Sequence, residues 1–366
     1  MKKIAVITTY PHFGSQNIGD QLITDSLIAM IKEIYPLAEI VTFWREDKFE
    51  EVSSELKHSD HIIFACLAIR PDFATKEYPY IQRLIDMDIP MSIISAGTSL
   101  DVSGTSDLDG YLSKNSIEVL KKLDNKVKAF GVRGALSYKF LKDLGLNNIV
   151  HTGDVAFYSK PHRNKPFEQP GSIKEIVISD PHRAVAYKNS FIELVSQLKS
   201  NFPDANLTVA LHGKNPLISK LCTNFGLKCE SIYKNKEFGL EIYDNADMHI
   251  GFRVHAHVSM LKRRKISYLL EQDGRGCDYG LTIPIKISVP NYQRLLSNLH
   301  HDFISDLLCY RSKHNFKQAP ISDAKILISL VLADLESSFG RFKSLHVDID
   351  GFCDKIAEQL KNVINI

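Results

Sequence analysis

Short apolar runs alternate with segments of helical spacing along the first 290 residues of the chain. Lys3 to Thr9 is a mostly apolar run, as expected for a strand buried on both faces of a sheet. In residues 21–35, apolar side chains recur every three or four positions, which predicts a helix with one buried face. A strand followed by a helix is the basic unit of a parallel sheet.

The same alternation continues through both halves of the chain. Further strands are predicted at residues 40–44, 61–68, 90–96, 126–132, 149–150, 175–179, 207–211, 247–252 and 266–270. Helices are predicted at residues 21–35, 46–58, 80–87, 115–123, 135–144, 188–201 and 216–225. The sequence therefore predicts an α/β protein built on parallel, doubly wound sheets.

A proline-rich stretch, Ser159 to Gly171, divides the two strand–helix series and is predicted to be a linker. We place one domain at residues 1–160 and a second at 172–290. Residues 291–366 form a helical tail, with helices expected at 293–309, 323–339 and 350–362. This tail could cover one domain, bridge both or form an interface between copies of the chain.

Composition places the chain among ordinary globular proteins. A hydrophobic fraction of 44% and a charged fraction of 24% are typical values. The formal net charge is +2, so no overall field points to nucleic acid as a partner. The apolar part of the N-terminal run is too short for a signal-peptide core, so none is expected there. The apolar run Ile326 to Ala333 is too short to span a bilayer.

Six cysteines are scattered without a C-x-x-C pair, which argues against a zinc ribbon or a disulfide scaffold. A reducing, cytoplasmic location is expected. The basic run at 262–265 leaves peripheral contact with the inner face of a membrane as an alternative. A solvated helix end is the simpler interpretation.

The stretch Asp247 to Lys265 organises the predicted chemistry. A short strand ends before Arg253 and His255, and a helix with a basic end follows. Strand ends and helix starts converge where open α/β sheets bind ligands, and free N–H groups at a helix start favour an anion. Arg253 adds a fixed cation, and His255 can exchange a proton near neutral pH. Anion recognition and proton transfer are therefore expected in one turn of chain.

A metal site is the weaker interpretation of His255 and His257. Two residues apart on a helix, their side chains diverge, whereas on an extended segment they would face the same side. Asp273 is the only candidate for a third ligand, and its spacing from the two histidines is not that of a metal site. No metal cofactor is expected.

Four places in the first half carry candidate contacts to a substrate. Asn17 and Asp20 lie at the first strand-to-helix turn, where simple capping by Asp20 is as good an explanation. Arg133 ends a strand and suits a carboxylate or phosphate, although pairing with a surface acid is the simpler interpretation. Gly97 and Thr98 follow one predicted strand, and Gly153 and Asp154 follow another. The second pair could form a simple turn, or Asp154 could be a buried carboxylate.

Strand ends in the second half offer a second set. Ser179-Asp-Pro-His182-Arg183 follows one predicted strand, and His212-Gly-Lys214 follows another. Either could equally be an exposed polar loop. A loop with Asp273 and Arg275 follows the strand at 266–270.

In this order the motifs resemble the polysaccharide pyruvyl transferase family over roughly residues 1–290. The resemblance is carried by Asn17-Ile-Gly-Asp20, Gly131-Val-Arg133 with Ser137 and Gly145, Gly153-Asp154-Val-Ala-Phe157, Gly251-Phe-Arg253-Val-His255, and the Asp273/Arg275 loop. The chain departs from the family pattern at Gly134 and Val155.

The resemblance implies two Rossmann-like domains facing a cleft, as in GT-B glycosyltransferases. It also implies phosphoenolpyruvate as donor and a sugar hydroxyl pair as acceptor. The product would be a pyruvate ketal on a cell-surface polysaccharide, such as a capsule or exopolysaccharide, or on its precursor. The residue matching Arg133 is expected to hold the donor, and the residue matching His255 is expected to be catalytic.

The residues suit that chemistry independently. A proton must reach the methylene carbon of the donor, and an imidazole with an ordinary pKa near 6.5 is a sensible general acid. Arg133 and Arg253 would neutralise a trianionic donor and stabilise the departing phosphate. The reaction needs no metal or other cofactor.

Two other functions stay open at this stage. One is a GT-B glycosyltransferase with a nucleotide-sugar donor, for which Glu271 and Tyr279 could contact ribose and base. The other is a non-catalytic anion- or sugar-binding protein of a polysaccharide complex. The acceptor sugar, its attachment to a lipid and the oligomeric state do not follow from the sequence.

Overall fold

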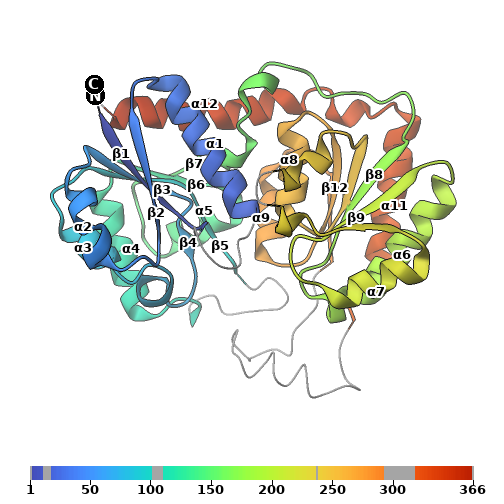
Figure 1. Ribbon diagram of the computed structural model, residues 1–366, viewed down its shortest axis with the longest axis horizontal. Coiled ribbons are helices and arrows are strands. Elements are labelled where there is room, and N and C mark those ends of the chain that lie inside the picture. The colour runs from blue at the N-terminus through green and yellow to red at the C-terminus, as the bar shows by residue number, and fades with distance from the viewer. Residues whose placement is uncertain (1, 11–17, 101–109, 236–237, 292–317, 365–366) are drawn as a thin grey trace. The chain divides into compact units, whose positions relative to one another are not determined.

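A computed structural model describes residues 2–10, 18–100, 110–235, 238–291 and 318–364 (Figure 1). The chain divides into two compact units. Unit 1 comprises Met1–Ser99, Asp109–Lys165 and His346–Ile366, and unit 2 comprises Leu100–Leu108 and Pro166–Leu345. Each unit is described by itself below.

Unit 1 is built on a parallel sheet with the strand order β2-β1-β3-β5-β6-β7. Its strands are β1 (Lys3–Thr8), β2 (Glu39–Trp44), β3 (His61–Ala65), β5 (Met91–Thr98), β6 (Ala129–Val132) and β7 (Ile149–His151), with the short β4 (Ala68–Ile69) beside β5. All residues of β3 and β5 are buried, as expected for central strands covered on both faces.

The helices of unit 1 come from both ends of the chain. They are α1 (Ile18–Ile34), α2 (Phe49–Lys57), α3 (Ile81–Asp86), α4 (Lys114–Lys126), α5 (Ala135–Asp143) and α12 (Leu345–Val363). Ser113 caps α4 by accepting a hydrogen bond from the backbone N of Ser116. Gly145 follows α5 with φ +89°, a backbone conformation that glycine adopts without strain.

The last helix, α12, packs through Phe352 against β7 and the turn Val155–Phe157. The ring of Phe352 stacks on Phe157 with centroids 6.0 Å apart and lies 6.3 Å from His151. Gly153, with φ +82°, passes so close that a Cβ there would lie 2.5 Å from the Phe352 ring. The C-terminal helix therefore belongs to the core of unit 1, although it is far from the other elements in sequence.

Unit 2 is also built on a parallel sheet, with the order β10-β9-β8-β11-β12-β13. The strands are β8 (Glu175–Ser179), β9 (Asn206–Ala210), β10 (Lys228–Glu230), β11 (Met248–Gly251), β12 (Ile266–Glu271) and β13 (Ser288–Pro290). The helices are α6 (Ala184–Asn201), α7 (Pro216–Phe225), α8 (Val254–Lys262), α9 (Gly274–Thr282) and α11 (Ile321–Glu336). This is the strand order of a Rossmann fold, in which the direction of winding reverses between the first and fourth strands. Here that switch lies between β8 and β11.

Most predicted elements are confirmed within a few residues, and β8 and α7 have the predicted limits. Helix α6 begins at Ala184, four residues before the predicted start at Lys188. The short strands β4, β10 and β13 were not predicted. The Asp273/Arg275 segment, expected to be a loop, instead begins helix α9. The helix predicted at 293–309 lies outside the described residues.

The predicted tail is divided between the units. Helix α11 lies in unit 2, where it packs on α6, β12 and β13, whereas α12 lies in unit 1. Across the described residues, no helix is long and apolar enough to cross a membrane.

Replacing Phe352 with alanine should lower the free energy of unfolding of unit 1 by about 3 kcal/mol, because a nearly buried ring leaves a cavity. Trp44, the single tryptophan, lies on β2 of unit 1 and reports its unfolding in urea by fluorescence. Val347→Ala is the matched control, since Val347 lies on the same helix but is 62% exposed. Equal urea midpoints for the two variants would show that Phe352 is not part of this core.

His61 makes the stability of unit 1 depend on pH. Its buried ring bonds to Ser92 Oγ at 2.9 Å, and burial, followed by the charges of Lys2 and Lys128, lowers its pKa to about 4. The unfolded chain takes up this proton near pH 6.5, so the contribution is fully present above 6.5 and lost as the pH falls toward 4.

His61→Gln should keep a hydrogen bond to Ser92 but remove the titrating group. Between pH 7 and 5 the variant is expected to lose about 2 kcal/mol less unfolding free energy than the parent protein. Urea unfolding at several pH values, followed by Trp44 fluorescence, measures the difference. His58→Gln, at an exposed position, is the control. Parallel pH profiles for parent and His61→Gln would contradict the assignment.

Candidate functional site

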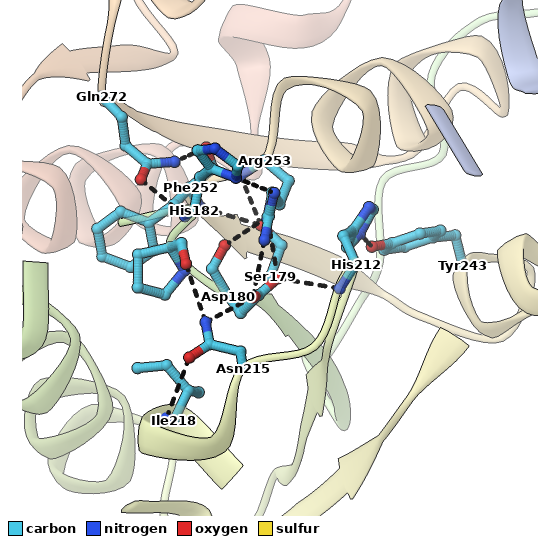
Figure 2. A network of polar contacts seen from close by, with 11 residues as sticks. Ser179, Asp180, His182, His212, Asn215, Ile218, Tyr243, Phe252, Arg253 and Gln272 are labelled. Atoms are coloured by element: carbon cyan, nitrogen blue, oxygen red, sulfur yellow. Dashed lines mark hydrogen bonds and ion pairs between the residues drawn. The ribbon is translucent and has the colours of Figure 1, made fainter. Parts of the chain in front are cut away.

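The carboxyl ends of β8 and β11 meet at the switch point of the unit 2 sheet. Asp180 follows β8 directly, and Arg253 lies two residues after β11, at the start of α8 (Figure 2). Ligands of open α/β sheets bind at this position, because the helices that follow the two strands lie on opposite faces of the sheet. The site is therefore sought among the residues around these two strand ends.

An ion pair between Asp180 and Arg253 lies at the centre of this cluster. Arg253 Nη2 donates to Asp180 Oδ2 at 2.9 Å, and Nε donates to both Oδ1 and the backbone oxygen at 3.0 Å. The Asp180 side chain is completely buried, whereas that of Arg253 keeps 19% exposure. Such a two-pronged contact fixes the plane of the guanidinium as well as its position.

Two further donors complete the surroundings of the Asp180 carboxylate. The backbone N of His212 donates to Oδ1 at 3.0 Å, and Asn215 Nδ2 donates to Oδ2 at 2.8 Å. Burial alone would raise the pKa of Asp180, but the charge and hydrogen bonds of Arg253, with help from His212, hold that pKa below its ordinary value. Asp180 is therefore an anion at neutral pH, and it fixes Arg253.

His212, predicted to bind substrate, lies on the inner side of the cluster. Its Nε2 is 2.6 Å from the hydroxyl of Tyr243, and both side chains are buried. Burial, followed by the charge of Arg253, lowers the pKa of His212 to about 3, and burial raises the pKa of Tyr243. Both groups are neutral at physiological pH, so together they add no net charge beside the ion pair.

Gln272 joins the ends of three strands. Its Oε1 accepts a hydrogen bond from the backbone N of His182, and its Nε2 donates to the backbone oxygen of Phe252. The loops after β8, β11 and β12 are thus held together by one amide side chain, as Figure 2 shows. The ring of His182 also meets Arg253, with Nδ1 and Nη1 3.2 Å apart.

Ser179, a predicted substrate contact, begins a chain of neutral hydrogen bonds inside the sheet. Its buried Oγ accepts from the backbone N of Phe252 and of Arg253, both at 2.9 Å, and lies 2.9 Å from His249 Nε2. The chain continues through Ser267 Oγ to His257 Nδ1. Burial keeps the pKa of His249 well below its ordinary value and lowers that of His257 to about 3. The Ser179 hydroxyl therefore holds the turn that carries Arg253.

Gly251 makes this close approach feasible. Its φ is +156°, and a Cβ at this position would lie 2.6 Å from the backbone oxygen of Ser179. A larger residue would separate β8 from the turn after β11, so Ser179 could no longer bind its amides. The glycine of the Gly251-Phe-Arg253 motif thus has a steric explanation.

His255 lies in the first turn of α8 and is partly exposed. The N-cap residue of this helix is Arg253, whose side chain makes no capping hydrogen bond. Because α8 is helical through both histidines, His255 and His257 point in different directions, and the His257 ring is buried against Ser267. Across the described ranges, no three His, Cys, Asp or Glu side chains form a group suited to a metal ion.

Asp273 and Arg275 form an ion pair with Nη2 and Oδ2 2.6 Å apart. Asp273 is the N-cap of α9, accepting a hydrogen bond from the backbone N of Arg275. Burial opposes ionisation, but Arg275 outweighs it and keeps the pKa of Asp273 below its ordinary value. This pair lies near His182, whose pKa responds to both charges.

In unit 1, Arg133 follows β6 and is 7% exposed. Its Nη2 donates to the backbone oxygen of Thr98 at 3.3 Å, and its Nη1 lies 3.8 Å from Cys66 Sγ. Gly97 packs against the same side chain, since a Cβ there would lie 2.2 Å from Arg133 Nε. Thr98 is fixed in turn by Ser137, whose Oγ accepts from its backbone N at 2.9 Å. Three predicted contacts, Gly97, Thr98 and Arg133, therefore lie together.

Cys66 completes this cluster and was not predicted. It has φ +72°, unusual for a residue with a side chain, and it follows β3 directly. Burial raises the pKa of its thiol to about 11, although Arg133 opposes the shift, and Asp154 and Asp20 add to it. The thiol is therefore protonated at neutral pH.

The remaining predicted residues of unit 1 have identifiable positions. Asp154 is completely buried and caps a short 3-10 turn, Val155–Phe157, by accepting from the backbone N of Ala156 at 2.8 Å. Asp20 lies inside the first turn of α1, which begins at Ile18, rather than before it as a cap. Asn17 lies outside the described residues.

The structure thus collects Ser179, His212 and Arg253 around one carboxylate in unit 2. The sequence analysis missed that carboxylate, Asp180, although its place directly after a predicted strand was a usable signal. Asn215 could have been recognised as the N-cap of α7, but not as a ligand of Asp180. Nothing in the local sequence marks Gln272 or Tyr243, which enter the cluster from distant segments.

Known proteins resemble the chain chiefly through its fold. The UDP-GlcNAc 2-epimerase from Neisseria meningitidis, solved with UDP-GlcNAc, has 10% identity and a TM-score of 0.51, covering 99% of this chain and 100% of that chain. The epimerase of Methanocaldococcus jannaschii has 11% identity and a TM-score of 0.46, covering 91% and 100%. The wall teichoic acid polymerase TagF has 12% identity and a TM-score of 0.43, covering 98% and 90%.

At such low identities the likeness concerns the fold alone: two parallel sheets with helices, as in GT-B-like proteins. No protein of curated function matches the sequence. The sequence model of one family, described as polysaccharide pyruvyl transferase, matches residues 17–259, more than half of the chain. This span contains the Arg133 motif and the Arg253/His255 turn. The chain belongs to the polysaccharide pyruvyl transferase family and is a transferase enzyme.

Proposed function

We propose that the protein transfers the enolpyruvyl group of phosphoenolpyruvate to two hydroxyls of a sugar in a cell-surface polysaccharide or its precursor. The product is a pyruvate ketal, and inorganic phosphate is released. The observation that carries the proposal is the turn after β11, where Arg253 is fixed by Asp180 and followed by His255. The match to the family supports the same reaction class.

Recognition of the donor is assigned to Arg253 and the start of α8. The helix has nine residues and no side-chain cap, so its first N–H groups favour an anion. Asp180 occupies Nε and one N–H of Nη2, and His182 Nδ1 lies 3.2 Å from Nη1, so the second N–H of Nη1 is the group proposed to contact the donor. A guanidinium held in this way needs little reorganisation when phosphate binds or departs.

His255 is proposed as the general acid. Its proton goes to the methylene carbon of the donor, which becomes a methyl group and leaves an oxocarbenium-like centre at the neighbouring carbon. A sugar hydroxyl attacks this centre, the bond to the phosphate oxygen breaks, and a second hydroxyl closes the ketal. The two hydroxyls release two protons, of which one restores His255 and the other leaves on phosphate.

Arg133 is proposed as a second donor contact, as the family resemblance implies. Its guanidinium is held by Thr98 and Cys66 at the ends of β5 and β3. The remaining predicted contacts to donor or acceptor stay as proposals: Asn17, Asp20, Gly97, Thr98, Asp154, Ser179, His212, Asp273 and Arg275. The proposed reaction uses phosphoenolpyruvate as a substrate and no cofactor.

His255→Ala should abolish turnover and leave donor binding measurable, because the imidazole supplies a proton whereas the arginines supply affinity. Incubation with phosphoenolpyruvate and a panel of glycosides, followed by phosphate release and a mass gain on the sugar, measures turnover. Calorimetry with phosphoenolpyruvate measures binding. Full activity of His255→Ala would remove His255 from the mechanism.

Two comparisons make that test specific. His58→Ala removes an exposed histidine from unit 1 and should retain the parent activity. Thermal shifts with phosphoenolpyruvate, UDP-sugars and GDP-sugars separate the proposal from nucleotide-sugar transfer. Stabilisation by a nucleotide sugar and indifference to phosphoenolpyruvate would contradict the proposed donor.

Arg133→Lys should weaken phosphoenolpyruvate binding by about tenfold, because lysine cannot present two parallel N–H groups to an oxyanion. The calorimetric dissociation constant measures the change, and a melting curve shows whether the variant is folded. Arg83→Lys is the control, since the Arg83 side chain is 57% exposed in a surface pair with Glu50. Unchanged affinity in a folded Arg133→Lys protein would contradict donor contact by Arg133.

A further inference from the structure

We propose that His182 is a further donor-binding residue, which gives its Nε2–H to an anionic oxygen of phosphoenolpyruvate beside Arg253. The inference rests on the proposed function, since it names another residue that recognises the same substrate. His182 lies in the loop after β8 and is exposed at the protein surface. It thus combines access to solvent with a position next to the arginine that is assigned to the donor.

The position of His182 is fixed at two points. Its backbone N donates to Gln272 Oε1 at 2.9 Å, and Gln272 is itself held by its bond to the backbone oxygen of Phe252 at 2.7 Å. Its ring nitrogen Nδ1 lies 3.2 Å from Arg253 Nη1. Figure 2 shows the ring of His182 between Gln272 and Arg253. The loop backbone and the ring are therefore both in place before a ligand binds.

The contact with Arg253 determines which ring nitrogen carries the proton. A guanidinium has only donors, so His182 Nδ1 must accept the hydrogen bond, and the single proton of the neutral ring resides on Nε2. No partner for Nε2 is found in the part of the chain that the structure describes. The outward edge of the ring is thus a hydrogen-bond donor.

Desolvation by its neighbours, with the charges around it, keeps His182 in this neutral form, although part of the side chain is exposed. Desolvation among neighbouring groups, followed by the charges of Arg253 and Arg275, lowers its pKa to about 4, while Asp273 opposes the shift. The residue contributes directed hydrogen bonding, not charge. It is also unsuited to act as a general base, because its only lone pair already binds Arg253.

Three substitutions separate donor binding from a structural role. His182→Ala removes the ring. In His182→Asn the amide occupies the position of Nδ1, so the contact with Arg253 can persist without the outward N–H. In His182→Gln the amide reaches the position of Nε2, so the outward donor can persist without that contact.

Steady-state kinetics and calorimetry with phosphoenolpyruvate provide the measurement. His182→Ala and His182→Asn should each raise KM and Kd for phosphoenolpyruvate about tenfold, with kcat changed less than about twofold. His182→Gln should stay within about threefold of the parent protein. His58→Ala, outside this cluster, should match the parent in every parameter.

Three other results would overturn the inference. Rescue by asparagine but not by glutamine would overturn the inference, because His182 would then serve only to hold Arg253. Parent-like affinity in all three variants would overturn it as well. Failure of the parent protein itself to bind phosphoenolpyruvate would overturn the proposed function, and this inference with it. Melting curves identify any variant that is unfolded. If one is, the ¹⁵N chemical shifts of the His182 ring in the labelled parent protein provide a second test. The inference requires that they show the proton on Nε2.

Discussion

The burial of one carboxylate, Asp180, governs the site in unit 2. A buried charge is strongly unfavourable unless donors surround it, and here Arg253, His212 and Asn215 provide them. These partners come from two other segments: His212 and Asn215 from the loop after β9, and Arg253 from the turn after β11. Satisfying a single anion therefore ties the loops after β8, β9 and β11 to one point. The two hydrogen bonds that Arg253 donates to Asp180 also fix the plane of its guanidinium.

The other polar side chains of the cluster are neutral, as expected for groups buried inside the sheet. Hydrogen bonds between Ser179, His249, Ser267 and His257 satisfy groups inside the sheet without adding charge to a medium that solvates ions poorly. A charged histidine there would compete with Arg253 for Asp180. Because the histidines are neutral, Asp180 and Arg253 form the ion pair at the switch point. The Asp180 carboxylate is buried in this pair, and the Arg253 guanidinium is partly exposed.

Membership of the family and the local chemistry support each other without depending on each other. The family establishes a transferase of polysaccharide pyruvyl type. Independently, a fixed guanidinium, an uncapped helix start and a histidine in the first helical turn are groups that suit a phosphorylated substrate needing a proton. In unit 1, Arg133 is also held by neighbouring strand ends, although its partners there are a carbonyl and a thiol.

The sequence by itself determined the parallel α/β architecture, most of its strands and helices, and the adjacency of Arg253 and His255. These features are local, because they depend on hydrophobic period and on residues a few positions apart. Only the tertiary structure decided that Arg253 pairs with Asp180, 73 residues away, and that Gln272 holds His182 across 90 residues. The strands β10 and β13 were missed because their three residues include no pair of adjacent apolar side chains like Ile149-Val150 of β7, so only pairing with longer neighbours defines them. Contacts between strand ends depend on the order of strands in the sheet, and sequence periodicity holds no information about that order.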